Sequence, residues 1–176
     1  MREERCFLII TGGTLTREFL EEYVREHVVS KVICVDGGLY VADEAGIAID
    51  YLVGDFDTAD ASLVGRYRRE IAEGKRKTIL KEYNPVKDAT DTQIAISLAL
   101  EEGADEIVLL GATGSRLDHT LANIHLLLKP LSCGVRAYIL DKNNKIYLMD
   151  RELELKKKEN MKIADKEIKG IIFDLD

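Results

Sequence analysis

An α/β fold, in which helices cover both faces of a mainly parallel sheet, is the fold class that the sequence predicts. Short, continuous apolar runs alternate along the chain with longer amphipathic segments, and glycine-rich turns follow several of the runs. Strands of a parallel sheet are buried on both faces, so they read as uninterrupted apolar runs. Their alternation with helices predicts a three-layer α/β/α architecture.

Each element in the first half of the chain has a local signal. The apolar run at 6–10 (CFLII) stops at Gly12 and Gly13 and predicts a buried strand. Thr16 is a candidate N-cap for a helix that reaches about residue 29. The further elements expected here are a strand at 32–35, a helix at 39–45, a strand at 51–53, a charged helix at 61–73 and a weak strand at 78–80.

The second half continues the same alternation. A helix is expected at 91–100, a strand at 107–110 and a helix from 117 to 128 that stops before Pro130. Two strands at 137–140 and 146–149 flank the turn sequence DKNN and predict a hairpin. Residues 1–150 are therefore expected to form one domain. The charged segment 151–176 is too short for another core, and we interpret it as a truncated or rudimentary second module.

Composition and charge exclude several classes of protein. The 25 Lys and Arg residues against 32 Asp and Glu residues give a net charge of −7, whereas nonspecific nucleic-acid binders are usually basic. No apolar run approaches the roughly 18 residues of a membrane span, and no secretory leader is evident. Three cysteines without a CxxC pair indicate reduced, mostly buried thiols. We expect a cytoplasmic protein with neither nucleic-acid nor membrane partners.

Acidic side chains gather where strands are expected to end. Asp36, Asp55 and Asp57 follow predicted strands, and Asp88 and Asp91 precede a predicted helix. Ligands of parallel sheets bind at the carboxyl ends of the strands. In extended chain Asp55 and Asp57 would point the same way, since side chains alternate. Several carboxylates at one edge would repel each other, and an oxygen-only ligand set favours Mg²⁺.

Glycine-rich turns and scattered cations complete the predicted edge. Glycines such as Gly12 and Gly13 let backbone amides approach a phosphate, and Lys87 and Arg116 can supply positive charge. The competing interpretation of either acidic cluster alone is an ordinary turn or cap, and Asp91 could simply cap its helix. His119 is a candidate base or an orienting hydrogen-bond partner.

Four motifs together resemble the catalytic domain of thiamine pyrophosphokinases. They are VDGG (35–38), GDFDT (54–58), KDATD (87–91) and GATGSRLDH (111–119), in the order found in that family. The resemblance implies a homodimeric, magnesium-dependent enzyme that transfers the diphosphate of ATP to the hydroxyl of thiamine and releases AMP. Residues 1–150 would be its nucleotide-binding catalytic domain, and the family's C-terminal β-sandwich would be missing or rudimentary in this chain.

The resemblance also suggests roles for individual residues. It implies that Asp55, Asp57 and Asp91 hold the metal. Asp57 and Asp91 would also belong to the catalytic residues, together with Asp36 and Asp88 as supporting acids of the same site. The positions that would contact the nucleotide are Gly12, Gly13, Lys87, Thr90, Arg116, Asp118 and His119. Ser115 departs mildly from the family pattern, which usually has a second glycine there.

Two alternatives remain open from the sequence. A pyrophosphokinase for another alcohol, such as a pterin, would carry a similar nucleotide half. A binding remnant without catalysis would retain ATP and metal but release no AMP. The acceptor, the general base (Asp57 or Asp91) and the oligomeric state are not determined by these motifs.

Overall fold

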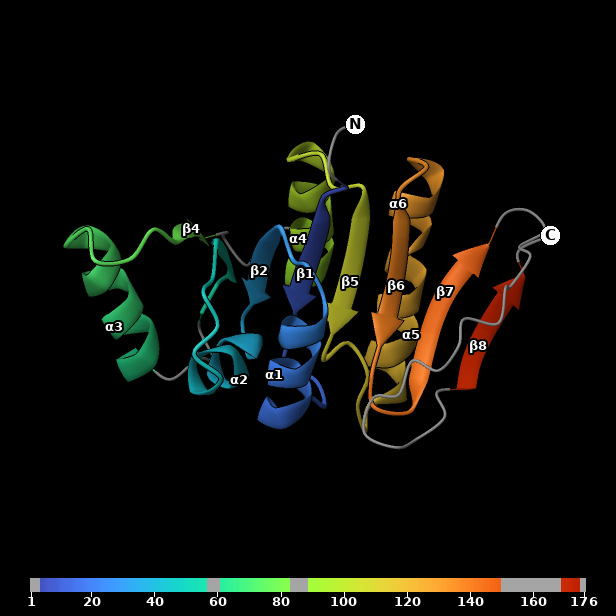
Figure 1. The fold of residues 1–176 in the computed structure, drawn as a ribbon, viewed down its shortest axis with the longest axis horizontal. Helices are drawn as coiled ribbons and strands as arrows, with labels where there is room; N and C mark the ends of the chain where they lie inside the picture. The colour runs from blue at the N-terminus through green and yellow to red at the C-terminus, as the bar shows by residue number, and fades with distance from the viewer. Residues whose placement is uncertain (1–3, 57–60, 83–88, 150–168, 175–176) are drawn as a thin grey trace.

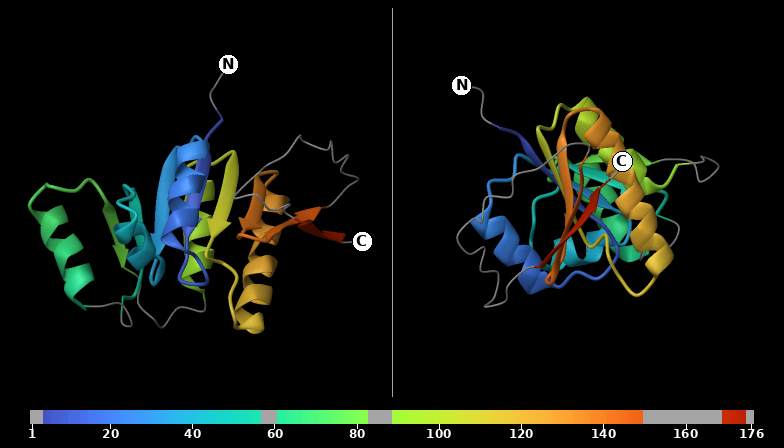
Figure 2. Two further views of the ribbon diagram at one scale, coloured as in Figure 1. Left: turned by 60° about the horizontal axis from the view of Figure 1, so that its bottom comes forward. Right: turned by 90° about the vertical axis from the view of Figure 1, so that its right-hand side faces the viewer.

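The computed structural model describes residues 4–56, 61–82, 89–149 and 169–174. One sheet crosses the whole molecule, with helices in front of it and behind it (Figures 1 and 2). The strands are β1 (Cys6–Ile10), β2 (Lys31–Val35), β3 (Tyr51–Gly54), β4 (Ile79–Glu82), β5 (Glu106–Leu110), β6 (Arg136–Leu140), β7 (Asn144–Met149) and β8 (Lys169–Asp174). The helices are α1 (Arg17–Glu26), α2 (Gly38–Glu44), α3 (Ala61–Ala72), α4 (Asp91–Glu101), α5 (Leu117–Leu126) and α6 (Leu128–Ser132).

The strand order is β4-β3-β2-β1-β5-β6-β7-β8, and every neighbouring pair is parallel except β6 and β7. The chain therefore winds outward from β1 in both directions, and β1, β2, β5 and β6 all end at the lower edge in Figure 1. The predicted hairpin is confirmed as β6 and β7. The segment β8, which lies in the predicted tail, pairs with β7 at the edge of the sheet.

Two apolar layers confirm the three-layer architecture. On one face of the sheet, side chains of α1, α2 and α3 pack on alternate strand residues such as Leu8 and Leu52. On the other face, α4 and α5 pack on the intervening residues such as Ile9 and Ile33, and α6 contacts β6 and β7. The four residues 7–10 are at most 2% exposed, which is the burial that an uninterrupted apolar run predicts.

The helix boundaries follow local chemistry closely. Thr16 caps α1 as predicted, because its side chain accepts a hydrogen bond from the amide of Phe19 at 3.3 Å. The helix predicted to stop before Pro130 is instead divided into α5 and α6, and Pro130 lies inside α6. The first turn of a helix tolerates proline, since its amides have no partner within the helix.

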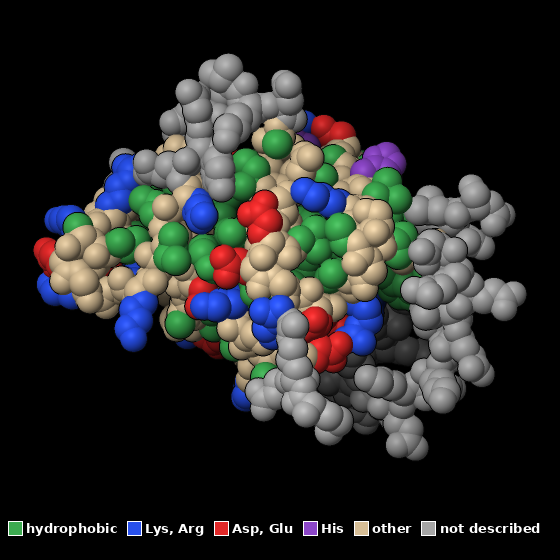
Figure 3. All heavy atoms as spheres, turned by 90° about the horizontal axis from the view of Figure 1, so that it is seen from above, with side chains coloured by type: hydrophobic (Ala, Val, Ile, Leu, Met, Phe, Trp, Pro, Cys, Tyr) green, Lys and Arg blue, Asp and Glu red, His purple; other side chains and the backbone are tan. Residues whose placement is uncertain are grey.

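Ion pairs occupy the edge where the parallel strands begin. Lys31 contacts Asp50 at 3.0 Å, and Arg136 contacts Glu106 at 3.1 Å and also Glu4. Seen from that side, acidic and basic side chains are interspersed among apolar ones (Figure 3). The opposite edge, where these strands end, carries the acidic motifs.

Two minor features complete the description. The cysteines lack disulfides, but only Cys34 is buried, whereas Cys6 is half-buried and Cys133 is exposed, so the prediction of mostly buried thiols is wrong for Cys133. Burial raises the pKa of the Cys6 thiol to about 12. None of the helices in the described ranges is long and apolar enough to cross a membrane.

Candidate functional site

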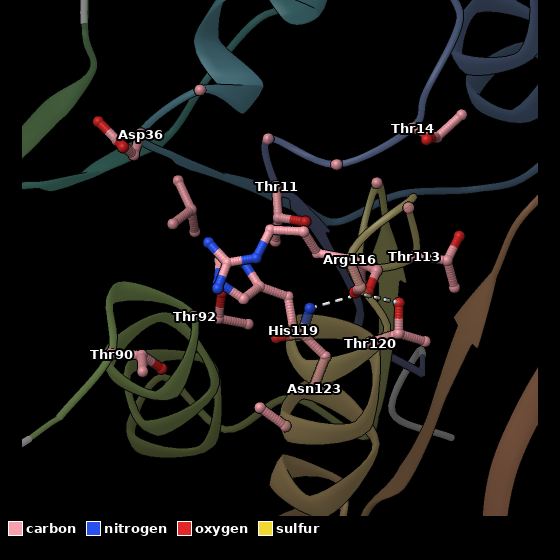
Figure 4. Close-up of a pocket in the computed structure, with 18 of the residues that line it drawn as sticks. Thr11, Thr14, Asp36, Thr90, Thr92, Thr113, Arg116, His119, Thr120 and Asn123 are labelled. Atoms are coloured by element: carbon pink, nitrogen blue, oxygen red, sulfur yellow. Dashed lines mark hydrogen bonds between the residues drawn. The ribbon is translucent and has the colours of Figure 1, made fainter. Parts of the chain in front are cut away.

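A pocket of about 710 Å³ opens at the edge where β1, β2 and β5 end. Its walls come from four places in the sequence: the turn after β1, the turn after β2, the start of α4, and the loop from β5 into α5 (Figure 4). A volume of this size suits a small-molecule ligand. The residues that line it are Thr11–Thr14, Val35–Gly37, Thr90–Thr92, Gly111–Arg116, His119, Thr120, Ala122, Asn123 and Leu126.

Most sequence-predicted site residues that the structure describes line this pocket. Asp36 and Thr90 lie on one side of it, and Arg116 and His119 come from α5 and its preceding turn (Figure 4). Asp91, the residue after Thr90, also lines it. Gly12 and Gly13 also line it. Asp118 does not. Asp57, Lys87 and Asp88 lie outside the described residues.

Three carboxylates interact at this edge. The pKa of Asp91 is raised by its partial burial and by the negative charges of Asp55 and Asp36. Asp91 is the first residue of α4, where the helix dipole favours a carboxylate. The raised pKa shows that burial and the neighbouring negative charges disfavour the ionised form of Asp91, which a bound cation would stabilise.

The capping role considered for Asp91 belongs to its neighbour. Thr90 is the N-cap of α4, and its hydroxyl accepts a hydrogen bond from the amide of Gln93 at 3.2 Å. The carboxylate of Asp91 is therefore not required to cap the helix. The Asp91 carboxylate is therefore able to bind a ligand.

The segment after β3 is not extended, contrary to the prediction. Phe56 has a φ of +56°, a conformation that a bulky side chain rarely adopts. Its ring is 8% exposed and packs in the core, as expected, and it lies over Gly54. Asp36 also has a positive φ, +37°. One member of the acidic cluster, Asp36, and the residue after another, Phe56, thus have positive φ angles. Such unusual backbone conformations are concentrated at functional sites.

The glycines pack one loop against another. A Cβ on Gly13 would lie 2.2 Å from the carbonyl oxygen of Gly111 and 2.4 Å from that of Thr113. The amide of Gly13 donates to the Gly111 carbonyl at 2.7 Å, and the amide of Thr14 donates to the Thr113 carbonyl at 2.7 Å. The predicted role of Gly13, presenting its amide to a phosphate, therefore competes with a structural bond between the turns after β1 and β5.

Arg116, a pocket residue with a positive charge, forms an ion pair with Asp118. The guanidinium of Arg116 pairs with Asp118 at 2.6 Å, and both side chains are about two-thirds exposed. This pair raises the pKa of Arg116 and lowers that of Asp118. Being exposed, Arg116 can exchange this partner for a phosphate at little cost.

Several pocket residues were missed by the sequence analysis. Thr11 and Thr14 flank the first glycine turn, and Thr120 and Asn123 follow Arg116 along α5. Asn123 donates from Nδ2 to the carbonyl of Ala112 at 2.8 Å, which ties α5 to the β5 loop. The signal was available, because residues 116, 119, 120 and 123 share one face of a helix.

A magnesium ion fits the chemistry of this edge. Within residues 4–56, 61–82, 89–149 and 169–174, no three Asp, Glu, His or Cys side chains are arranged to hold a metal by themselves. Mg²⁺ does not need such a cage, because it binds through one or two carboxylates, water and substrate phosphates. Asp55 and Asp91 offer the oxygen ligands it prefers.

Comparison with known proteins identifies relatives of this chain. Residues 25–139 match the family model of the thiamin pyrophosphokinase catalytic domain. A thiamine pyrophosphokinase of Bacillus subtilis is 37% identical over 142 residues, which are 80% of this chain and 63% of that protein. This chain thus spans less than two thirds of that relative's length.

Solved structures agree with the sequence comparison. The crystal structure of the Bacillus subtilis thiamine pyrophosphokinase aligns with a TM-score of 0.61 at 33% identity, over 78% of this chain and 61% of the other. The yeast thiamin pyrophosphokinase aligns with a TM-score of 0.62 over 80% of this chain and 59% of the other, but at 14% identity, and shows the fold alone. The chain belongs to the thiamin pyrophosphokinase catalytic-domain family.

Proposed function

We propose that this chain binds ATP with Mg²⁺ in the edge pocket and transfers the diphosphate to the hydroxyl of thiamine, releasing AMP. The observation that carries the proposal is the convergence of three family motifs on one pocket, with Asp36, Asp91 and Arg116 in its walls. The names of the similar proteins support thiamine as the acceptor. No observation favours a pterin or a purely binding role.

The pocket is suited to holding a triphosphate. Asp55 and Asp91, with Asp57, would hold the magnesium ion, and that ion would neutralise phosphate charge. The starts of α4 and α5 both face the pocket, and helix N-termini favour anions. Lys87 and Arg116 would bind phosphate oxygens, with Asp88 and Asp36 as supporting acids and Thr90 and His119 beside the nucleotide.

The reaction itself requires alignment more than covalent assistance. The hydroxyl oxygen of thiamine would attack the β-phosphorus, and the bond from that phosphorus to the oxygen of the α-phosphate would break. The hydroxyl proton would pass to Asp57 or Asp91. We further propose that the protein is a cytoplasmic homodimer without nucleic-acid or membrane partners. Light scattering after size-exclusion chromatography would measure the mass of the assembly.

Calorimetry and product analysis test the proposal. ATP should bind in the presence of Mg²⁺ and bind much more weakly in excess EDTA. Addition of thiamine should yield AMP and thiamine diphosphate, whereas a pterin alcohol should not. ATP affinity that is unchanged by EDTA would refute the proposed metal-dependent site. A chain extended with the remainder of the Bacillus subtilis relative serves as a comparison, because it shows whether acceptor binding needs further sequence.

A further inference from the structure

A single carboxylate in the β6–β7 turn joins two distant parts of the chain. Asp141 Oδ1 accepts hydrogen bonds from the amides of Asn143 and Asn144, both at 2.8 Å. Asp141 Oδ2 accepts one from the hydroxyl of Thr113, also at 2.8 Å. The side-chain amide of Asn144 also donates to both oxygens, at 3.0 Å to Oδ1 and 3.1 Å to Oδ2. The Asp141 carboxylate therefore closes its own turn, and through Oδ2 it also holds the loop after β5.

The sheet register explains why these residues meet. In the parallel pair of β5 and β6, Leu110 lies opposite Leu140. The segments that follow both residues leave the sheet side by side at its carboxyl edge. Thr113 lines the pocket, whereas Asp141 does not. Any effect of Asp141 on a bound ligand must therefore pass through the loop it holds.

Thr113 is also hydrogen-bonded to a second loop, the turn after β1. Its carbonyl accepts a hydrogen bond from the amide of Thr14 at 2.7 Å, and Thr14 also lines the pocket. The contacts form a chain from Asp141 through Thr113 to Thr14. Hydrogen bonds to a carboxylate are stronger than those between neutral groups, so the first link is well suited to fix the loop.

We propose that Asp141 is a positioning residue of the nucleotide pocket, holding Thr113 and, through it, Thr14 in the arrangement that the ligand requires. The inference rests on the proposed function for the identity of the ligand. Loops fixed before binding lose less conformational freedom when the ligand arrives, so loosening them weakens binding. Mutating residues that orient metal ligands typically costs about 10- to 100-fold in affinity, and by analogy we expect a loss of about 10-fold here.

Two measurements on Asp141→Ala test the proposal. Hydrogen exchange at the Thr14 amide, followed by NMR without ligand, should accelerate on the order of 10-fold because local opening becomes easier. Calorimetry should show Mg²⁺-ATP affinity reduced by about 10-fold. Asn143→Ala is the matched control, because it alters an exposed side chain of the same turn and keeps the backbone amide. It should change neither quantity.

Variants of Thr113 separate positioning from a general disturbance of the turn. Thr113→Val removes the hydroxyl and should accelerate Thr14 exchange as Asp141→Ala does, whereas Thr113→Ser should preserve protection. In the Thr113→Val background, Asp141→Ala should have no further effect. If Asp141→Ala does not fold, Thr113→Val tests the same bond from its other end.

The outcomes distinguish failure of the inference from failure of the proposed function. Unchanged Thr14 exchange in Asp141→Ala or Thr113→Val, or additive effects in the double variant, would overturn the positioning role. Wild-type protein that binds no Mg²⁺-ATP would overturn both the proposed function and the nucleotide part of this inference. Accelerated exchange together with unaltered ATP affinity would leave the proposed function standing and refute the positioning role.

Discussion

Replacing Gly13 by alanine distinguishes a structural glycine from one that serves a phosphate. The new Cβ would lie 2.2 Å from the Gly111 carbonyl oxygen and 2.4 Å from the Thr113 oxygen. Because carbon and oxygen pack no closer than roughly 3.3 Å, the two loops would separate by about 1 Å. The two 2.7 Å hydrogen bonds between these loops would then stretch beyond about 3.5 Å and be lost.

The expected cost follows from these displacements. Each lost hydrogen bond contributes about 1 kcal/mol, and overpacking adds at least about 1 kcal/mol. We therefore expect Gly13→Ala to lower the free energy of unfolding by about 3 kcal/mol. That corresponds to roughly 10 °C in melting temperature for a chain of this size.

Urea unfolding followed by circular dichroism measures this difference. The matched control is Gly65→Ala in α3, where a Cβ would meet nothing within 4 Å. Alanine is a better helix former than glycine, so the control should be stabilised by about 0.5–1 kcal/mol. A Gly13→Ala protein as stable as wild type, with ATP affinity alone reduced, would refute the packing argument and restore the phosphate interpretation of this glycine.

Three further predictions concern the charges of the pocket and its acceptor. Asp91→Asn should abolish the effect of Mg²⁺ on ATP affinity, as calorimetry with and without EDTA would show. The folded state raises the pKa of Asp91, so the ionised form of this side chain opposes folding. Asp91→Asn should therefore unfold at a higher urea concentration than wild type at pH 7. This difference in stability should vanish as the pH falls through the raised pKa toward the unfolded-state value of about 3.9. Equal unfolding midpoints at pH 7 would contradict this. Arg116→Ala should weaken ATP binding about 10-fold and leave the melting temperature unchanged, since its pair with Asp118 is exposed; an unaltered affinity would mean that the guanidinium serves only that pair. Thiamine affinity of the 176-residue chain should be weaker than that of the chain extended with the remainder of the Bacillus subtilis relative, and equal affinities by calorimetry would place the acceptor site within the present residues.

Local chemistry predicted the elements of the fold well. Uninterrupted apolar runs identified β1, β2 and β5, because strands buried on both faces have no polar side. The hairpin of β6 and β7 was also predictable, since its turn lies between the two strands. The position of β1 at the centre of the sheet was not, because each parallel connection can return to either side of the preceding strand.

Sequence reasoning predicted the edge of the sheet at which the site residues lie, but not the contacts that they make there. The rule that ligands bind at the carboxyl ends of parallel strands brought Asp36, Asp91 and Arg116 to one pocket. The positive φ of Phe56 was not predictable, because it results from burial of the ring in a core formed by distant residues. The bond from Thr113 to Asp141 depends on strand register, so the turn sequence alone did not reveal it.

The two edges of the sheet differ in the arrangement of their charged side chains, and this difference bears on the free energy of ligand binding. Where the strands begin, opposite charges such as Lys31 and Asp50 pair with each other. Where the strands end, Asp36 and Asp55 raise the pKa of Asp91, while Arg116 pairs with Asp118 outside the pocket lining. The raised pKa means that the ionised form of Asp91 is disfavoured in the folded protein, so a cation that arrives with the ligand would gain by stabilising that form.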